Sequence, residues 1–381
     1  MSDGFPLLWL CGPSGVGKTS VGWEIFARLD RAGTAVGYLD ADQVGLCYPA
    51  PADDPQTHRV KAANVGAMAR TLHAAGARCL VLSGGVQQAA EVTAYAEAVP
   101  GTSLTLCRLR VDIDQLRERF LGRGWRPELL AENERTAAAL DRATFADLTV
   151  DSTGLSRSAT VRLVLERAAG WPGPAAPAPP PSPAPASSVG APSGPVPVLW
   201  VCGASGVGKS EVAFAIFSRL FGAGVKAAYQ DLAQLGFLGP VPAPADAAAH
   251  RLRARGLAAV WPNYRAAGAR CLILAGDIAD PETVRDYAAA VPEGRFTLVR
   301  LHAGADALRE RVLLRGRGLG PQLPGDPLRG RSTEELLAHA EASARTAEAL
   351  ERAGVGTVRV TTDGRTIEDI ATEAARSLPA L

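Results

Sequence analysis

The 381-residue sequence lacks most features of secreted, membrane or nucleic-acid-binding proteins. Its formal net charge is only +1, from 40 basic and 39 acidic residues, and arginines alternate with acidic residues along helical segments. Solvated helix faces account for these arginines better than a nucleic-acid or membrane surface does. No run approaches the roughly 20 apolar residues of a membrane span, and the start "MSDGFPLLWLCG" lacks the basic residues and long apolar stretch of a signal peptide. We expect a cytoplasmic protein.

Cysteine is also scarce, and none of the six cysteines forms a Cys-x-x-Cys pair. Cys11, Cys79, Cys202 and Cys271 lie in apolar, strand-like runs. Buried thiols in a reducing compartment explain this pattern better than disulfides or a metal site.

What the sequence does contain is an internal repeat of about 190 residues. "CGPSGVGKTS" returns as "CGASGVGKSE", "AAGARCLVLSGG" as "AAGARCLILAGD" and "LRERFLGRG" as "LRERVLLRGRG". This similarity predicts two copies of one domain, at 1–170 and 198–381, which could pair within the chain. The linker at 171–197 is rich in proline and alanine, and its proline density favours an extended, semi-rigid spacer.

Within each copy, apolar β-rich runs alternate with helical patterns. In the first copy we predict strands at Leu7–Cys11, Ala35–Leu39, Cys79–Ser83, Leu104–Leu109 and Leu148–Asp151. We predict helices at Lys18–Arg31, Thr57–Ala75, Gln88–Ala98, Ile113–Leu121, Glu128–Ala143 and Ser156–Ala169. This alternation indicates the α/β class: two tandem sandwiches, each with a parallel sheet covered by helices on both faces.

Each copy carries a phosphate-binding loop of the form Gly-x4-Gly-Lys-Ser/Thr between an apolar strand and an amphipathic helix. Its glycines let successive amide N–H groups turn inward, and the helix N-terminus adds positive potential. The lysine reaches the β- and γ-phosphates, and the last hydroxyl ligates Mg2+. ATP and Mg2+ are therefore the expected cofactors. The predicted nucleotide-binding residues are Gly12, Ser14, Gly15, Val16, Gly17, Lys18 and Thr19, then Gly203, Ser205, Gly206, Val207, Gly208, Lys209 and Ser210, with Thr19 and Ser210 as metal ligands.

Several classes of P-loop protein do not fit. The guanine-reading Asn/Thr-Lys-x-Asp motif of GTPases is absent from the sequence. Hexameric ATPases and helicases have a strand that ends in Asp-Glu, whereas the corresponding strands here end in "LVLSGG" and "LILAGD". "LSGGVQQ" looks like the signature of transporter ATPases, but it closes a strand instead of opening a helix. The small-molecule kinases remain.

Two acidic residues, Asp40 and Asp42 in "YLDADQVG", follow the second predicted strand beside the phosphate loop. At this carboxyl edge of the sheet, one carboxylate can hold Mg2+ through water while the other orients or deprotonates an acceptor hydroxyl. The alternative is an ordinary acidic turn that caps the next helix.

The order of phosphate loop, Asp-x-Asp, glycine pair and arginine-rich lid resembles the group of adenylylsulfate kinase, shikimate kinase and chloramphenicol phosphotransferase. The resemblance implies a P-loop kinase fold and Mg-ATP-dependent transfer to a small-molecule hydroxyl. It makes Asp40 the magnesium-side carboxylate and Asp42 the acceptor-side one. It further implies acceptor-pocket residues Ser83, Gly84 and Gly85, and lid cations Arg117, Arg119 and Arg123.

A lid arginine can raise the rate of phosphoryl transfer by roughly 10^3- to 10^5-fold. We therefore predict Arg123 as catalytic together with Lys18 and the two aspartates. Pairing with Glu118 on an exposed helix is the alternative for the lid arginines. His58 and Arg59 open a long helix and are candidates for reading an anionic substrate, although a histidine at a helix start also serves as a surface cap.

The two copies differ on the acceptor side. Asp231 occupies the position of Asp40, but Ala233 replaces Asp42, and Asp277 replaces Gly85. The N-terminal copy is thus the more complete transfer site. The C-terminal copy is a kinase with an altered acceptor or a nucleotide-holding partner. In the alternative hypothesis, both copies are nucleotide-sensing modules without a small-molecule acceptor. The sequence does not identify the acceptor.

Overall fold

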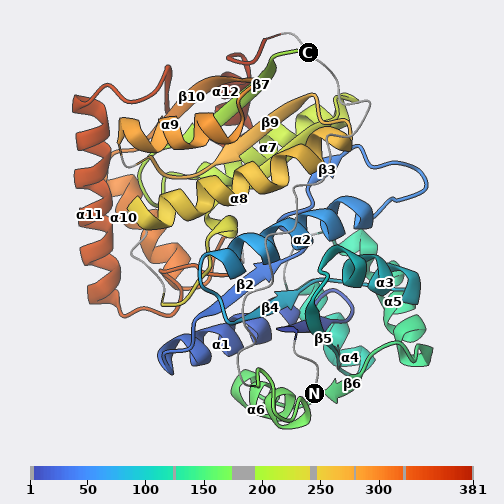
Figure 1. Ribbon diagram of the computed structural model, residues 1–381. Helices are drawn as coiled ribbons and strands as arrows, with labels where there is room; N and C mark the ends of the chain where they lie inside the picture. Colours follow the sequence, from blue (N-terminus) through green and yellow to red (C-terminus); the bar gives the residue numbers. More distant parts are fainter. Residues whose placement is uncertain are drawn as a thin grey trace. The chain divides into compact units, whose positions relative to one another are not determined.

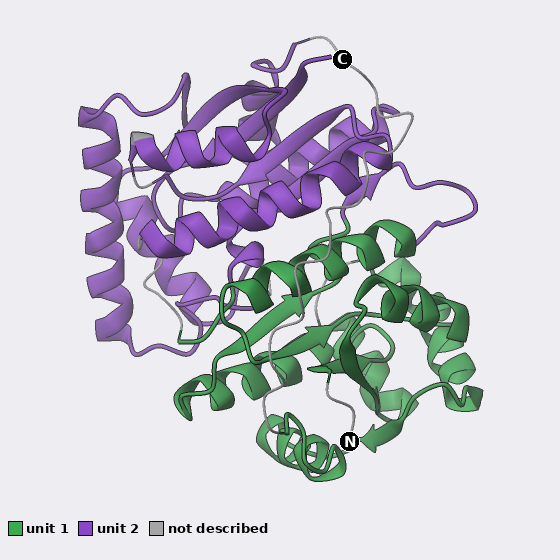
Figure 2. Ribbon diagram, viewed as in Figure 1, with its two compact units in different colours: residues 1–45, 58–186, 237–242 green, residues 46–57, 187–236, 243–381 purple. Residues whose placement is uncertain are grey.

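The computed structural model describes residues 4–122, 126–173, 194–240, 247–278, 280–320 and 323–379. The chain forms two compact units, which Figure 2 shows in different colours. Unit 1 comprises Met1–Gly45, His58–Ala186 and Phe237–Pro242, and unit 2 comprises Leu46–Thr57, Ser187–Gly236 and Ala243–Leu381. Among the described residues, none of the helices has the length and apolar character needed to cross a bilayer.

Unit 1 alternates strands and helices along the chain (Figure 1). Its strands are β1 (Phe5–Cys11), β2 (Val36–Asp40), β4 (Cys79–Ser83), β5 (Thr102–Arg110) and β6 (Leu148–Asp151). Its α-helices are α1 (Lys18–Arg31), α2 (His58–Ala74), α3 (Ala89–Ala98), α4 (Ile113–Leu121), α5 (Leu130–Arg142) and α6 (Arg157–Arg167), and a 3-10 turn, η1 (Pro127–Leu129), precedes α5.

The sheet of unit 1 has the order β2-β4-β1-β5-β6, and its strands are parallel. On one face, Leu8 and Leu10 of β1 pack with apolar residues of α1 and α6. On the other face, the ring of Trp9 lies 4.5 Å from that of Tyr95 in α3. A parallel sheet buried on both faces is the expected arrangement, so the predicted α/β class is confirmed.

Unit 2 has the same succession of elements (Figure 1). Its strands are β3 (Cys47–Tyr48), β7 (Val196–Cys202), β8 (Ala227–Asp231), β9 (Cys271–Ala275), β10 (Gly294–His302) and β11 (Val358–Thr361). Its helices are α7 (Lys209–Gly222), η2 (Leu232–Leu235), α8 (Ala247–Ala266), α9 (Pro281–Ala290), α10 (Ala305–Gly316), α11 (Thr333–Arg352) and α12 (Ile367–Ala375). The sheet order β11-β10-β7-β9-β8-β3 repeats that of unit 1 apart from the added β3, which is antiparallel to β8.

Most predicted boundaries agree with the structure to within two or three residues. The predicted helices Lys18–Arg31 and Ile113–Leu121 are observed without change. The helix predicted at Glu128–Ala143 begins two residues later, at Leu130, and Pro127–Leu129 before it forms a 3-10 turn.

The edge strands β2 and β8 each acquire a partner that the repeat pattern did not predict. In unit 2, the backbone N–H of Tyr229 donates to Leu46 at 2.9 Å, and Cys47 pairs with β8. In unit 1, the N–H of Tyr38 donates to Phe237 at 3.0 Å. Leu46 and Cys47 come after β2 in the sequence but pair with β8. Phe237 comes after β8 in the sequence but pairs with β2. Such pairing covers backbone groups that an open edge would expose.

All six cysteines are buried free thiols, as predicted. Burial raises the pKa of Cys11 and Cys202, which precede the two phosphate loops, to about 12. These thiols are therefore protonated at neutral pH and are poor nucleophiles.

Candidate phosphate-binding and acceptor sites

The loop after β1 has the backbone conformation of an anion cradle. Gly12, Gly15 and Gly17 have φ angles of 139°, 89° and 107°, which side-chain-bearing residues rarely adopt. A Cβ atom at Gly12 would lie 2.5 Å from the carbonyl oxygen of Leu109. Gly17 is the N-cap of α1 and no side chain caps the helix, so its positive end is left to an incoming anion.

The loop after β7 in unit 2 repeats this geometry. Gly203, Gly206 and Gly208 have φ angles of 138°, 79° and 97°. A Cβ atom at Gly203 would lie 2.5 Å from the carbonyl oxygen of Leu301, and no side chain caps α7. Both loops therefore have the backbone that their shared motif predicts.

The carboxyl ends of β1, β2 and β4 bring the polar residues of unit 1 together. Asp40 ends β2 beside Ser83, which ends β4, as register partners. The Asp40 carboxylate accepts hydrogen bonds from the Thr19 hydroxyl at 2.9 Å and the Ser83 hydroxyl at 3.0 Å. The hydroxyls of Ser83 and Tyr38 are 2.8 Å apart. Asp40 is thus joined directly to the last residue of the phosphate loop.

The surroundings of Asp40 perturb its ionisation. Burial, followed by the negative charge of Asp42, raises the pKa of Asp40 from 3.8 to about 6, although the bonds from Thr19 and Ser83 oppose the shift. A carboxylate with this pKa is ionised at neutral pH and accepts a cation or a proton more readily than an exposed one.

Asp42 has a different environment, although it lies two residues from Asp40. Its carboxylate is half exposed and forms an ion pair with Lys61 of α2 at 2.7 Å. The removal of part of its surface from water pushes the pKa of Asp42 upward, but the ammonium groups of Lys61 and Lys18 outweigh this effect and hold the pKa below its ordinary value. Its backbone N–H donates to the Asp40 carboxylate at 3.0 Å, and this hydrogen bond holds the two aspartates in one turn.

The loop lysines of both units donate to carbonyl oxygens of their own loops. The Lys18 ammonium donates to the carbonyl oxygens of Gly12 and Pro13 at 2.9 and 3.0 Å. Lys209 donates to the carbonyl oxygen of Ala204 at 3.0 Å and forms an ion pair with Asp277 at 2.8 Å.

The hydroxyl–carboxylate pair at the end of the phosphate loop is present in both units. The Ser210 hydroxyl donates to Asp231 at 2.6 Å, as Thr19 does to Asp40 in unit 1. The other oxygen of Asp231 accepts the backbone N–H of Ala233 at 3.0 Å. Burial raises the pKa of Asp231 above its ordinary value. Because residue 233 is alanine, the second carboxylate of this turn is missing.

The lid arginines divide into two groups. Arg119 of α4 donates to the carbonyl oxygen of Val16 at 3.4 Å and to Gln115 at 2.8 Å. The equivalent residue in unit 2, Arg311, donates to the carbonyl oxygen of Val207 at 3.4 Å. Each therefore contacts its phosphate loop directly.

Of the other two candidate lid arginines, the structure describes only Arg117. Arg117 is half exposed and forms ion pairs with Glu134 of α5 at 2.8 Å and Asp114 at 3.1 Å, so its acidic partners differ from the Glu118 named in the alternative. Arg123 lies outside the described residues.

Two contacts to the phosphate loops were missed by sequence reasoning. In unit 1, the amide of Asn133 on α5 accepts the N–H of Ser14 and donates to its carbonyl oxygen, both at 2.9 Å. In unit 2, His339 of α11 lies 2.9 Å from the Ser205 hydroxyl.

The remaining predicted acceptor residues lie near the start of α2 and the end of β4. His58 contacts Tyr95 at 3.5 Å and Glu91 at 3.5 Å, while Arg59 is exposed. A Cβ atom at Gly84 would lie 2.7 Å from that of Ala41, so a glycine is needed where the ends of β2 and β4 meet.

Gly85, the next residue after Gly84, is half-buried. A Cβ atom there would meet no heavy atom within 4 Å. This open space is the position that a side chain occupies in unit 2, where the equivalent residue is Asp277.

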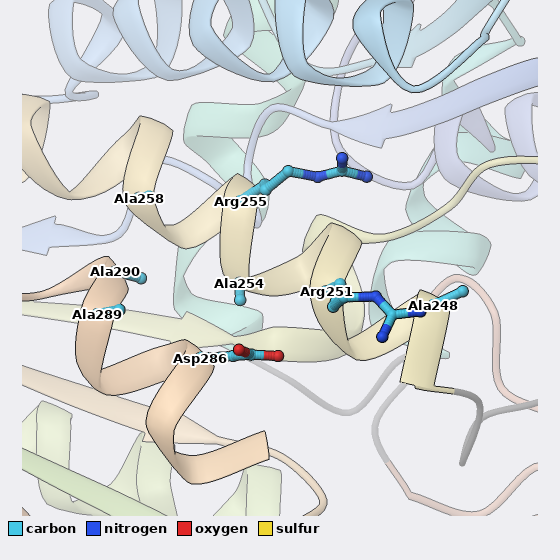
Figure 3. A pocket seen from close by; sticks show the side chains of 8 residues that line it. All are labelled: Ala248, Arg251, Ala254, Arg255, Ala258, Asp286, Ala289 and Ala290. Atoms are coloured by element: carbon cyan, nitrogen blue, oxygen red, sulfur yellow. The ribbon is translucent and has the colours of Figure 1, made fainter. Parts of the chain in front are cut away.

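A cavity of about 400 Å³ lies elsewhere in unit 2, between α8 and α9. Figure 3 shows Arg251 and Arg255 projecting from α8 and Asp286 from α9, with alanines making up the rest of the wall. No residue of the phosphate loop lines this cavity, so it is separate from the candidate nucleotide site.

Comparison with known proteins gives similarity of fold alone. No protein-family model matches the sequence, and no curated protein sequence is significantly similar to it. The tunicamycin resistance protein of Deinococcus radiodurans is 19% identical, with a TM-score of 0.36, and the match covers 43% of this chain and 95% of that protein. The APS kinase of Mycobacterium tuberculosis, solved with AMPPNP and APS, is 19% identical, with a TM-score of 0.31 and coverage of 48% and 98%.

The shikimate kinase of Acinetobacter baumannii, solved with shikimate, is 20% identical, with a TM-score of 0.31 and coverage of 43% and 93%. Each match spans less than half of this chain. Any functional assignment therefore has to come from the geometry of the sites.

Proposed function

We propose that the protein is an Mg-ATP-dependent phosphotransferase that acts on a small-molecule hydroxyl, with the transfer site in unit 1. The observation that carries this proposal is the hydrogen bond, 2.9 Å long, between the Asp40 carboxylate and the hydroxyl of Thr19, which follows the glycine cradle in the sequence. We further propose that 1–170 and 198–381 are duplicated kinase-like domains joined by the linker at 171–197.

The residues of unit 1 fit a nucleoside triphosphate with magnesium. The positive φ angles of the loop glycines and the uncapped N-terminus of α1 suit a polyphosphate. Thr19 and Asp40 would hold the metal, because magnesium in such sites uses one or two protein oxygens together with phosphate oxygens and water. When bound, Mg-ATP supplies the transferable phosphoryl group and an electrophilic phosphorus.

Lys18 and Asp42 then have separate tasks in the reaction. The Lys18 ammonium exchanges its carbonyl partners for phosphate oxygens and offsets their charge. Asp42, kept ionised by Lys61, accepts the proton of the acceptor hydroxyl or orients that hydroxyl. Positioning and charge compensation are what phosphoryl transfer chiefly requires.

Supporting residues act on the loop from outside. Asn133 fixes the Ser14 peptide through both its N–H and its carbonyl oxygen, so this peptide is already oriented before the nucleotide binds. Arg119 holds the Val16 carbonyl oxygen from α4. Of these two helices, α4 carries the segment expected to form the lid.

The proposal is tested by ADP release from Mg-ATP with a panel of hydroxyl-bearing acceptors. Lys18→Ala should abolish acceptor-dependent release. Asp42→Asn should keep the ATP affinity measured by calorimetry while reducing transfer by at least about 100-fold, the usual contribution of acid–base catalysis. Asp114→Asn, an exposed carboxylate of α4, is the matched control and should behave as wild type. Equal loss of ATP affinity in Lys18→Ala and Asp42→Asn would contradict these roles.

A further inference from the structure

The phosphate loop of unit 2 has a histidine beside it. The Nε2 atom of His339 on α11 lies 2.9 Å from the hydroxyl oxygen of Ser205. Ser205 lies between Gly203 and Gly206, two of the glycines whose positive φ angles shape the loop. The His339 ring is partly buried. Because histidine is the side chain whose charge ordinarily changes between pH 5 and pH 8, the loop has a neighbour that can gain a proton near neutral pH.

The charged groups that act on His339 come from several parts of unit 2. Burial and the positive charge of Arg315 on α10 lower the pKa of His339 below its ordinary value, and Lys209 at the start of α7 acts in the same direction. The negative charges of Asp326 and Asp277 oppose this shift without reversing it. The ring is therefore mostly neutral at neutral pH.

Two independent observations place His339 on the phosphate side of the loop. One is its contact with Ser205 at 2.9 Å. The other is its electrostatic interaction with Lys209, the residue that the loop motif assigns to the β- and γ-phosphates. A polyphosphate in this loop therefore adds negative charge close to a ring that is surrounded by few net charges of its own.

Added negative charge favours the protonated form of histidine. The imidazolium carries a donor on each nitrogen and makes a charge-assisted hydrogen bond to a phosphate oxygen, which a neutral ring cannot match. We propose that His339 is a phosphate contact of unit 2 that takes up a proton as the nucleotide binds, so that binding strengthens as the pH falls. This inference rests on the proposed function, since it takes the loop of unit 2 to bind a nucleoside triphosphate.

The test uses the full-length chain with the loop of unit 1 disabled by Lys18→Ala, so that calorimetric titration with Mg-ATP reports on unit 2. The variant is His339→Gln, because a glutamine amide reaches the position of Nε2 and keeps a hydrogen-bonding group beside Ser205 but does not titrate. At pH 8 the parent and the variant should bind about equally. At pH 6 the parent should bind about tenfold more tightly than the variant, because a nearby opposite charge commonly changes a pKa by about one or more.

Proton uptake gives a second readout, which a purely structural contact would not change. At pH 7, binding enthalpies measured in PIPES and in Tris, which differ in ionisation enthalpy, give the number of protons taken up per nucleotide. The parent should take up a fraction of a proton more than His339→Gln, and proton exchange by the nucleotide itself cancels in this difference. His302→Gln is the matched control, because this histidine of unit 2 lies 3.7 Å from Glu351 on the other side chain's account and not beside Ser205; it should keep the proton uptake of the parent.

The outcomes are distinct. Equal proton uptake and equal pH dependence in the parent and in His339→Gln, even with a uniform loss of affinity, would show that His339 only supports the loop, and this would overturn the inference alone. If the Lys18→Ala chain binds no Mg-ATP at pH 6 or pH 8, the nucleotide site of unit 2 is wrong and the inference fails with it, while the transfer proposed for unit 1 still stands. Lys18→Ala/Lys209→Ala gives the background heat. Circular dichroism checks that each variant is folded, and His339→Asn replaces His339→Gln if the latter is not.

Discussion

Replacing Asp40 with asparagine should stabilise unit 1 while removing the proposed activity. The Asp40 carboxylate is 6% exposed, and it accepts from the Asp42 N–H as well as from two hydroxyls. Asparagine keeps the acceptor for that N–H, and its amide group can donate to the hydroxyls of Thr19 and Ser83. The substitution therefore removes a buried charge without breaking the local hydrogen bonds.

The magnitude follows from the raised pKa of Asp40. Its value of about 6 in the folded protein, against 3.8, means that the folded state binds more protons than the unfolded state between about pH 4 and pH 6. The free energy of unfolding therefore falls as the pH rises through this window. The difference in pKa corresponds to about 3 kcal/mol. This destabilisation is fully present above about pH 6 and disappears below about pH 4.

Scanning calorimetry without Mg2+ measures this directly. At pH 8, Asp40→Asn should raise the melting temperature of the unit 1 transition by roughly 5–10 °C. At pH 4.5 the gain should be much smaller, because the wild-type carboxyl is then largely protonated. Asp231→Asn is the equivalent substitution in unit 2, where burial also raises the pKa of Asp231. An equal gain at both pH values, or a loss of stability at pH 8, would refute this reasoning.

Three further predictions concern the site and the fold. Lys61→Met should raise the pKa of Asp42, because the ion pair at 2.7 Å is lost while burial remains, and should move the acid limb of the pH–rate profile upward. Asn133→Ala should weaken ATP binding by unit 1 roughly tenfold by calorimetry, because two hydrogen bonds that orient the phosphate loop are lost. A fragment of residues 198–381 should self-associate in light scattering, because it lacks 46–57 and leaves the edge of β8 without its partner.

Each of these has a result that counts against it. An acid limb unchanged in Lys61→Met would show that Lys61 does not set the ionisation of Asp42. ATP affinity in Asn133→Ala no different from that of Glu132→Ala, an exposed neighbour on α5, would show that the loop needs no support from this helix. A monomeric fragment as stable as unit 2 of the intact chain would show that β3 adds nothing to the sheet.

Local signals in the sequence explain the helices that were predicted well. α1 begins where Gly17 takes a positive φ, and α4 begins after Asp112, whose side chain accepts the N–H of Gln115. α5 begins two residues after its predicted start, because the residues from Pro127 to Leu129 form a 3-10 turn. These are properties of a few consecutive residues.

Contacts between distant residues could not be predicted in this way. Asn133 reaches Ser14 across 119 residues, and Lys61 reaches Asp42 from another element. Asn64 of α2 is fully buried and donates to the Val44 carbonyl oxygen at 2.6 Å. Which side chains meet depends on how helices cross the sheet, and one sequence contains no direct record of that.

By itself, the sequence determined the repeat, the alternation of strands and helices, and the two phosphate loops, because glycine spacing and apolar periodicity act over short stretches of chain. Only the tertiary structure decided which groups the loops meet. It placed Asp40 against Thr19, Lys61 against Asp42 and Asp277 against Lys209. The physical reason is that parallel strands gather their carboxyl ends at one edge of a sheet, so residues far apart in sequence share one electrostatic environment there.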